Sequence, residues 1–114
     1  MRTYIAALVV LTLLGTSHAH AASFDCAKAK TADEKTICRN PSLSDADVKM
    51  ATMFQMNTRL VMMGARGNMQ DRQREWLVER NACKGSFKCL TAAYAKRLNE
   101  LQVDFDGIAS RGPF

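Results

Sequence analysis

The chain has 114 residues, and its 16 Lys and Arg outnumber its 11 Asp and Glu to give a formal net charge of +5. A chain of this length forms a single domain with a modest core. Both histidines, His18 and His20, fall in the opening segment. The rest of the chain therefore lacks the imidazole needed for Ser–His or Cys–His couples and for histidine metal sites. We expect no enzyme, no catalytic residue, no metal and no cofactor.

The opening segment, residues 1–21, has the pattern of a signal peptide. Arg2 provides a positive start, residues 5–14 are apolar, and Ala19-His20-Ala21 is a small-x-small cleavage site. The apolar run is well short of the ~20 residues that cross a bilayer. We expect residues 22–114 to be one exported domain, periplasmic or secreted, without stable membrane insertion. Without Arg2 it retains 15 Lys and Arg against 11 Asp and Glu, a net charge of +4.

Four cysteines form two short-range pairs, Cys26 with Cys38 and Cys83 with Cys89. An even count in a small exported domain indicates disulfides, although four cysteines allow three connectivities. We expect the local pairing, for which chain-entropy estimates give roughly 3 kcal/mol for the first loop and roughly 2.4 kcal/mol for the second. A four-thiolate zinc site and a redox pair are the alternatives. The spacings miss those of zinc knuckles, and no Cys-x-x-Cys motif is present.

The first helices are predicted from their start signals. Thr31-Ala32-Asp33-Glu34 is a capping-box sequence, which predicts a short helix over residues 32–38. Asn40-Pro41 ends this helix, and Ser42 or Ser44 is expected to cap a longer second one. The inward positions of the second helix recur every three or four residues. They are Leu43, Asp47, Met50, Phe54, Asn57 and Val61.

Two turns separate the remaining helices. The glycines within residues 64–68 predict the first turn, and Lys84-Gly85-Ser86-Phe87 predicts the second. The third helix is expected over residues 69–82, with one side formed by Met69, Gln73, Trp76, Leu77 and Arg80. The fourth helix carries the stripe Leu90, Tyr94, Leu98, Leu101, Phe105 and Ile108, and it is expected to fray over residues 107–113. No segment alternates with a period of two, so we expect an all-α fold: a small disulfide-stapled bundle of three to four helices.

Two charged residues, Asp47 and Arg80, fall on these inward-facing stripes. Burying either charge alone is costly, so we expect them to pair across the second and third helices, with Gln73 or Tyr94 completing the hydrogen bonds. Trp76 lies one turn before Arg80. We expect it to pack in the core rather than to form a stacking platform for a sugar or peptide. We interpret Asp47, Arg80, Trp76 and Tyr94 as buried structural residues.

Surface residues suggest further interpretations. Glu75 and Glu79, near Arg72, are expected to form a solvated salt-bridge face rather than a glycosidase pair. Most methionines are expected to pack in the core rather than to bind Cu(I), with Met56 turned toward solvent. The cations favour an envelope polyanion or an acidic protein patch over nucleic acid, because export removes the chain from the cytoplasm. These cations are Arg59, Arg66, Arg72, Arg74, Lys84, Lys88, Lys96 and Arg97.

The residues around the cysteines carry a family resemblance. In chain order they are Phe24-Asp25-Cys26, Glu34-Lys35-Thr36-Ile37-Cys38, Pro41-Ser42-Leu43 with Asp47, Arg74-Glu75-Trp76-Leu77, Arg80-Asn81-Ala82-Cys83, and Cys89-Leu90 with Tyr94 and Arg97. This pattern resembles the LprI-type lysozyme-inhibitor family over residues 24–101. The chain differs from that pattern in having Asn81 where Asp is common and Phe54 where Tyr is frequent. It also has no lipobox before Cys26, so no lipid anchor is expected.

The resemblance implies a protein partner, a lysozyme, that is blocked without a covalent bond. Animal-type lysozymes are basic but hold two catalytic carboxylates in a cleft. A positively charged inhibitor gains no long-range attraction, yet a cation on a preorganised loop could reach those carboxylates. The candidate binding residues are Lys84, Phe87 and Lys88 in the Cys83–Cys89 loop. The alternative is an envelope interaction module, such as a periplasmic immunity or accessory protein; the oligomeric state is not predicted.

Overall fold

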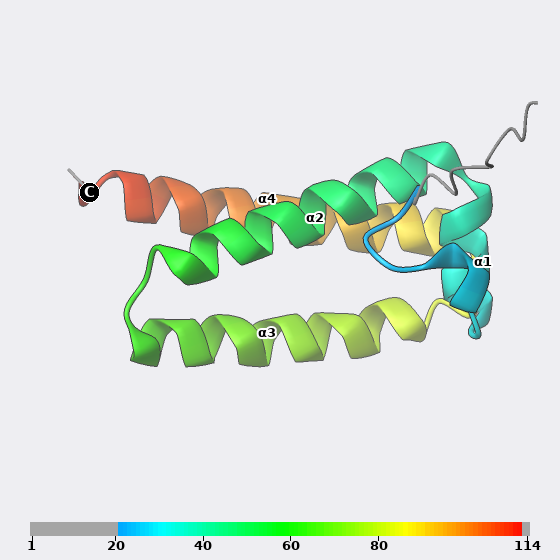
Figure 1. The fold of residues 1–114 in the computed structure, drawn as a ribbon, viewed down its shortest axis with the longest axis horizontal. Coiled ribbons are helices and arrows are strands. Elements are labelled where there is room, and N and C mark those ends of the chain that lie inside the picture. The colour runs from blue at the N-terminus through cyan, green and yellow to red at the C-terminus, as the bar shows by residue number, and fades with distance from the viewer. Residues whose placement is uncertain (1–20, 113–114) are drawn as a thin grey trace, which may run out of the picture.

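The computed structural model describes residues 21–112, so nearly all of the expected signal peptide lies outside the described residues. Within that range the chain is all-helical and carries two disulfides, as predicted (Figure 1). The elements are the 3-10 helix η1 (Cys26–Lys28) and the helices α1 (Ala32–Arg39), α2 (Pro41–Arg59), α3 (Met63–Asn81) and α4 (Phe87–Ala109). Helices α2 and α4 lie side by side, α3 runs along them, and α1 crosses one end of the bundle (Figure 1).

Side-chain caps start α1 and α4. At α1, the Thr31 side chain accepts a hydrogen bond from the Glu34 backbone N–H, and the Glu34 carboxylate accepts one from the Thr31 backbone N–H. This is the predicted capping box. At α4, the Ser86 hydroxyl accepts a hydrogen bond from the Cys89 backbone N–H at 3.3 Å. The caps fix where the chain enters each helix at the end of the bundle that holds the disulfides.

The predicted cap of α2 was wrong. The helix begins at Pro41, and both Ser42 and Ser44 lie inside its first turn. Proline favours the first helical position because its φ is already helical and its missing N–H has no helical acceptor there. The buried Ser44 hydroxyl instead donates a hydrogen bond to the Ile37 carbonyl at 2.7 Å. Ser44 therefore joins α2 to α1 rather than starting α2.

The predicted turn at residues 64–68 was also wrong. Helix α3 already begins at Met63, and the chain turns at residues 60–62. Gly64 and Gly67 lie in the helix with open space around them. A glycine in a helix costs only about 1 kcal/mol relative to alanine. Arg66 offsets that cost, because its side chain donates hydrogen bonds to the Thr58 and Val61 carbonyls at 2.8 and 3.3 Å.

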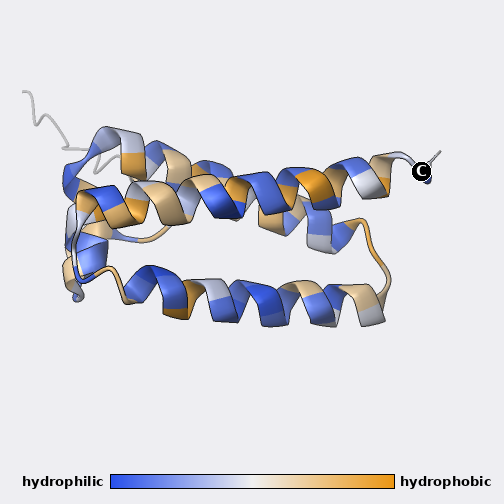
Figure 2. Cartoon of the chain, turned by 180° about the vertical axis from the view of Figure 1, so that it is seen from behind, coloured by the Kyte–Doolittle hydropathy of each residue, from blue (hydrophilic) through white to orange (hydrophobic). Residues whose placement is uncertain are grey.

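The apolar core is concentrated where α1, α2 and α4 meet. It contains Ile37, Leu43, Met50, Leu90, Tyr94 and Leu101, with Trp76 as its member from α3. Met50 is 3% exposed and Met56 49% exposed, as predicted. Met62 and Met63 are 87% and 85% exposed, so the prediction that most methionines pack in the core was wrong. Helix α3 is largely hydrophilic (Figure 2), and its Val78 is 71% exposed. Polar contacts are therefore important in holding α3 to the bundle.

Both disulfides pair cysteines that are close in sequence, as predicted. The Cα atoms are 5.8 Å apart in Cys26–Cys38 and 5.5 Å apart in Cys83–Cys89. All four cysteines are in disulfides, so none is a free thiolate that could bind zinc in this state of the protein. Such a framework indicates an oxidising, extracytoplasmic environment. Within residues 21–112, no helix combines the length and the apolar character required to cross a membrane.

Candidate functional site

The Cys83–Cys89 loop is fixed by its own backbone and by α1. Lys84 and Gly85 have φ angles of 50° and 82°, in the left-handed region that favours glycine. The Gly85 backbone N–H donates a hydrogen bond to the Asp33 carboxylate at 2.7 Å, and its carbonyl accepts one from the Thr36 hydroxyl at 3.0 Å. A Cβ at position 85 would lie 3.2 Å from both the Ala32 Cβ and the Thr36 hydroxyl oxygen. The tight turn therefore requires glycine.

Asp33 is the anchor residue that the sequence did not reveal. Its side chain is almost fully buried, although it lies in the first turn of α1 between two capping-box residues. An acidic residue at that place ordinarily indicates a solvated carboxylate near the positive helix terminus. Its partner, the Gly85 N–H, is 52 residues away in the chain. No local pattern could have linked the two.

The loop presents the three predicted binding residues to solvent. Lys84 and Lys88 are exposed, and Phe87 is 49% exposed. Within residues 21–112, neither lysine forms a salt bridge. A disulfide spans the base of the loop and α1 holds its tip, so the two ammonium groups and the aromatic ring project from a preorganised backbone.

The four predicted structural residues come together behind this loop. The Asp47 carboxylate is fully buried and accepts a hydrogen bond from the Tyr94 hydroxyl at 2.7 Å. Arg80 Nη1 donates to the same hydroxyl at 3.4 Å and lies 3.8 Å from Asp47 Oδ1. Ser23 donates its backbone N–H at 2.8 Å and its hydroxyl at 2.5 Å to Asp47 Oδ2. This cluster ties α2, α3, α4 and the N-terminal segment together.

Aromatic packing completes this buried cluster. Trp76 is 2% exposed, its ring meets that of Tyr94 edge to face at 5.1 Å, and the Arg80 guanidinium lies 5.7 Å from the Trp76 centroid. The indole N–H donates to the Ala93 carbonyl at 3.0 Å. Burial, reinforced by the hydrogen bond to Asp47, raises the pKa of Tyr94. The indole presents no open stacking face, and the cluster forms a polar core.

Arg97 was predicted to be a surface cation, and this prediction was wrong. Its side chain is fully buried, with Nε donating to Gln73 at 3.0 Å and Nη1 to Glu100 at 2.9 Å. Gln73 in turn donates to the Met50 sulfur at 3.1 Å and does not join Asp47. The sequence placed Arg97 between Tyr94 and Leu101 at helical spacing, which was a usable sign of burial. Arg97 therefore bridges α3 and α4.

Most of the other predicted cations are engaged across or along the helices. Arg72 pairs with Asp104 and Lys96 with Glu79, both at 2.9 Å, while Arg74 pairs with Asp71. Glu79 raises the pKa of Lys96. Helices α3 and α4 form a groove with mixed charges along these pairs, lined by Arg72, Glu75, Trp76, Glu79, Lys96 and Glu100. Glu75 and Glu79 thus border a salt-bridged surface.

Comparisons with protein-family models, with curated proteins and with solved structures find no match to this chain. The resemblance to LprI-type lysozyme inhibitors therefore remains a hypothesis based on the residue pattern. Within residues 21–112, no three His, Cys, Asp or Glu side chains are grouped so that they could hold a metal ion. The candidate site is the exposed surface of the Cys83–Cys89 loop, with Lys84, Phe87 and Lys88.

Proposed function

We propose that this protein is an exported inhibitor that blocks a lysozyme by inserting the Cys83–Cys89 loop into the enzyme's cleft. One observation carries the proposal: two exposed lysines, Lys84 and Lys88, project from a backbone fixed by a disulfide and by Asp33. The family resemblance supplies the target class. The two disulfides agree with export. On this proposal the signal peptide directs the chain to the periplasm or beyond and is cleaved after Ala21.

The chemistry of the loop matches that of a lysozyme cleft. A muramidase cleft contains two carboxylates a few ångströms apart, and a lysine ammonium is a compact cation that could lie between them. Because the loop is already ordered, little conformational entropy is lost on binding. Phe87, half exposed beside the lysines, offers apolar area of the kind that anchors interfaces. Short-range complementarity thereby compensates for the repulsion between two basic proteins.

The test is a lysozyme turbidity assay with the oxidised protein recovered after export. The wild type should slow lysis in a dose-dependent manner, and the Lys84→Ala/Lys88→Ala variant should lose most of this effect. The matched control is Arg59→Ala/Arg111→Ala, which removes two exposed cations outside the loop and should inhibit like the wild type. Equal inhibition by the lysine variant would refute the role of the loop. Absence of inhibition across several lysozyme types would favour the alternative, an envelope interaction module.

A further inference from the structure

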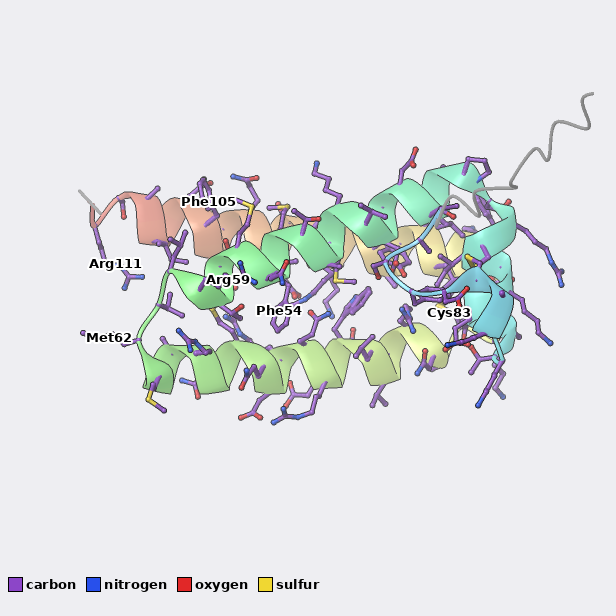
Figure 3. The ribbon with its side chains drawn as sticks, in the orientation of Figure 1. Phe54, Arg59, Met62, Cys83, Phe105 and Arg111 are labelled. Carbon is purple, nitrogen blue, oxygen red and sulfur yellow. A yellow bond between two sulfur atoms is a disulfide. The ribbon has the colours of Figure 1, made fainter. Side chains whose placement is uncertain are left out.

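An apolar tip lies at the end of the bundle opposite the disulfides. We call residues 60–63, with Ile108 and Arg111 beside them, the distal tip. Met62 and Met63 are 87% and 85% exposed. The link between α2 and α3 is orange in Figure 2, and Met62 lies at the outer end of the molecule in Figure 3. Residues 60–62 also border a shallow hollow of about 350 Å³.

The turn that carries these methionines is held in place. Arg66 donates to the Thr58 and Val61 carbonyls, which are otherwise left open at the end of α2. The Arg66 backbone N–H also donates to the Met62 carbonyl at 2.9 Å, closing the first turn of α3. The two thioether side chains therefore project from an ordered turn. Isolated exposed apolar residues are common, but an adjacent pair this exposed at a helix-to-helix turn suggests an interaction site.

The distal tip is also positively charged. Arg111 lines the hollow beside Met62, and Arg59 and Arg66 flank residues 60–63 in the chain. Residues 57–70 contain no Asp or Glu, while Asp104 and Asp106 lie on the turn of α4 before Ile108. The closest carboxylate in the adjoining hollow is that of Asp104, which pairs with Arg72 at 2.9 Å. Two copies meeting tip to tip would bring six arginines together, while the nearby carboxylates of Asp104 and Asp106 already accept hydrogen bonds from Arg72 and Gln102. Self-association is therefore disfavoured by charge, and a negatively charged surface that also accepts apolar side chains is favoured.

We propose that the distal tip docks peripherally on an anionic phospholipid surface. Met62 and Met63 would enter the boundary between headgroups and acyl chains, and Arg59 and Arg111 would contact lipid phosphates. Apolar insertion combined with basic residues is the general basis of reversible membrane association. The Cys83–Cys89 loop, at the opposite end of the bundle, would then face away from the membrane (Figure 3). This inference is independent of the identity of the loop's partner.

The experiment is co-sedimentation of the oxidised, exported protein with vesicles of phosphatidylcholine, with and without one quarter phosphatidylglycerol. An intact mass first establishes that the signal peptide is absent. We expect binding to the anionic vesicles that weakens at high salt. Met62→Ser/Met63→Ser should weaken it about tenfold, and Arg59→Ala/Arg111→Ala about fivefold for each arginine.

Two control variants distinguish binding through the distal tip from non-specific apolar or electrostatic binding elsewhere on the protein. Val78→Ser/Val103→Ser removes two other exposed apolar side chains, 71% and 62% exposed, and should bind as the wild type does. Lys84→Ala/Lys88→Ala removes two cations at the other end and should also retain binding. No binding to anionic vesicles, or equal losses in tip and control variants, would overturn the proposal. Loss of a dimer in the methionine variant, without vesicle binding by the wild type, would instead assign the tip to self-association.

Discussion

Replacing Asp47 with Asn perturbs the buried cluster without changing its shape. The carboxylate accepts hydrogen bonds from Tyr94 and from both the backbone and the hydroxyl of Ser23, and it faces the Arg80 guanidinium. An amide of the same size keeps one acceptor oxygen but places an NH₂ group where a second acceptor stood. Asp47→Asn therefore leaves a donor opposite Ser23 or Tyr94 and a buried cation without its counter-charge.

The expected loss of unfolding free energy follows from burial. The side chains of Asp47 and Arg80 are 1% and 9% exposed, so water cannot replace the missing charge. Removing one partner of a buried ion pair costs about 3–5 kcal/mol. The 3.8 Å separation and the intervening Tyr94 hydroxyl place this pair at the lower end. We expect a loss of about 3 kcal/mol, a large part of the ~5–15 kcal/mol that stabilises a typical domain.

Urea unfolding followed by Trp76 fluorescence measures this loss. Trp76 is the single tryptophan of the chain, and its ring lies against the Tyr94 ring and the Arg80 guanidinium, so it reports on the cluster itself. The matched control is Asp45→Asn on the exposed face of the same helix, which should change stability by less than about 0.5 kcal/mol.

A loss below about 1 kcal/mol for Asp47→Asn would refute the reasoning, because it would place the cluster in the weak range of solvated ion pairs. A double variant gives a second check. Asp47→Leu/Arg80→Met removes both charges, and it should be more stable than Asp47→Asn because no unpaired charge is left in the core.

Three further predictions concern pH and the disulfide of the loop. Backbone N–H groups hold the pKa of Glu34 below its usual 4.5, so its stabilising contribution is present above that value and lost on acidification. Glu34→Gln should be less stable than the wild type at neutral pH, and the difference should shrink on acidification below 4.5 in thermal unfolding. Burial and Asp47 raise the pKa of Tyr94, so the neutral phenol stabilises the fold up to its ordinary value of 10.0, and that contribution is lost above it. In protein whose intact mass shows that Tyr4 is absent, Tyr94 is the single tyrosine, and near-ultraviolet absorbance should show it ionising only as the protein unfolds. Ionisation near 10 in the folded protein would contradict this. Cys83→Ser/Cys89→Ser should lower the free energy of unfolding by roughly 2.4 kcal/mol, and an unchanged urea midpoint would contradict that estimate.

The helices and the disulfide pairing were predictable because their signals are local. The capping box at Thr31 is contained within four residues, and each disulfide joins cysteines only 12 or 6 positions apart. Asp47 and Arg80 were predicted to pair because each interrupts an apolar helical stripe. Burial of both without a partner would be too costly.

The remaining features depend on tertiary contacts that no local pattern specifies. The turn before α3 lies at residues 60–62 rather than at the glycines, because Arg66 bonds back to the end of α2. Asp33 is buried because α4 begins beside α1 and presents Gly85 to it. Arg97 is buried with Gln73 on α3 and Glu100 on its own helix as partners of Nε and Nη1, while its buried Nη2 has no hydrogen-bond partner among the described residues.

Calorimetric titration of a lysozyme tests the central claim most directly. Four affinities are needed: wild type and Lys84→Ala/Lys88→Ala, each against active lysozyme and against a lysozyme whose catalytic carboxylates are changed to amides. If the loop reaches those carboxylates, removing the lysines or the lysozyme carboxylates should each weaken binding. The loss of binding free energy when both are removed should be smaller than the sum of the two separate losses, by a coupling energy of at least about 1.5 kcal/mol. Strictly additive losses, or binding that ignores both changes, would contradict the proposal that the Cys83–Cys89 loop occupies the cleft.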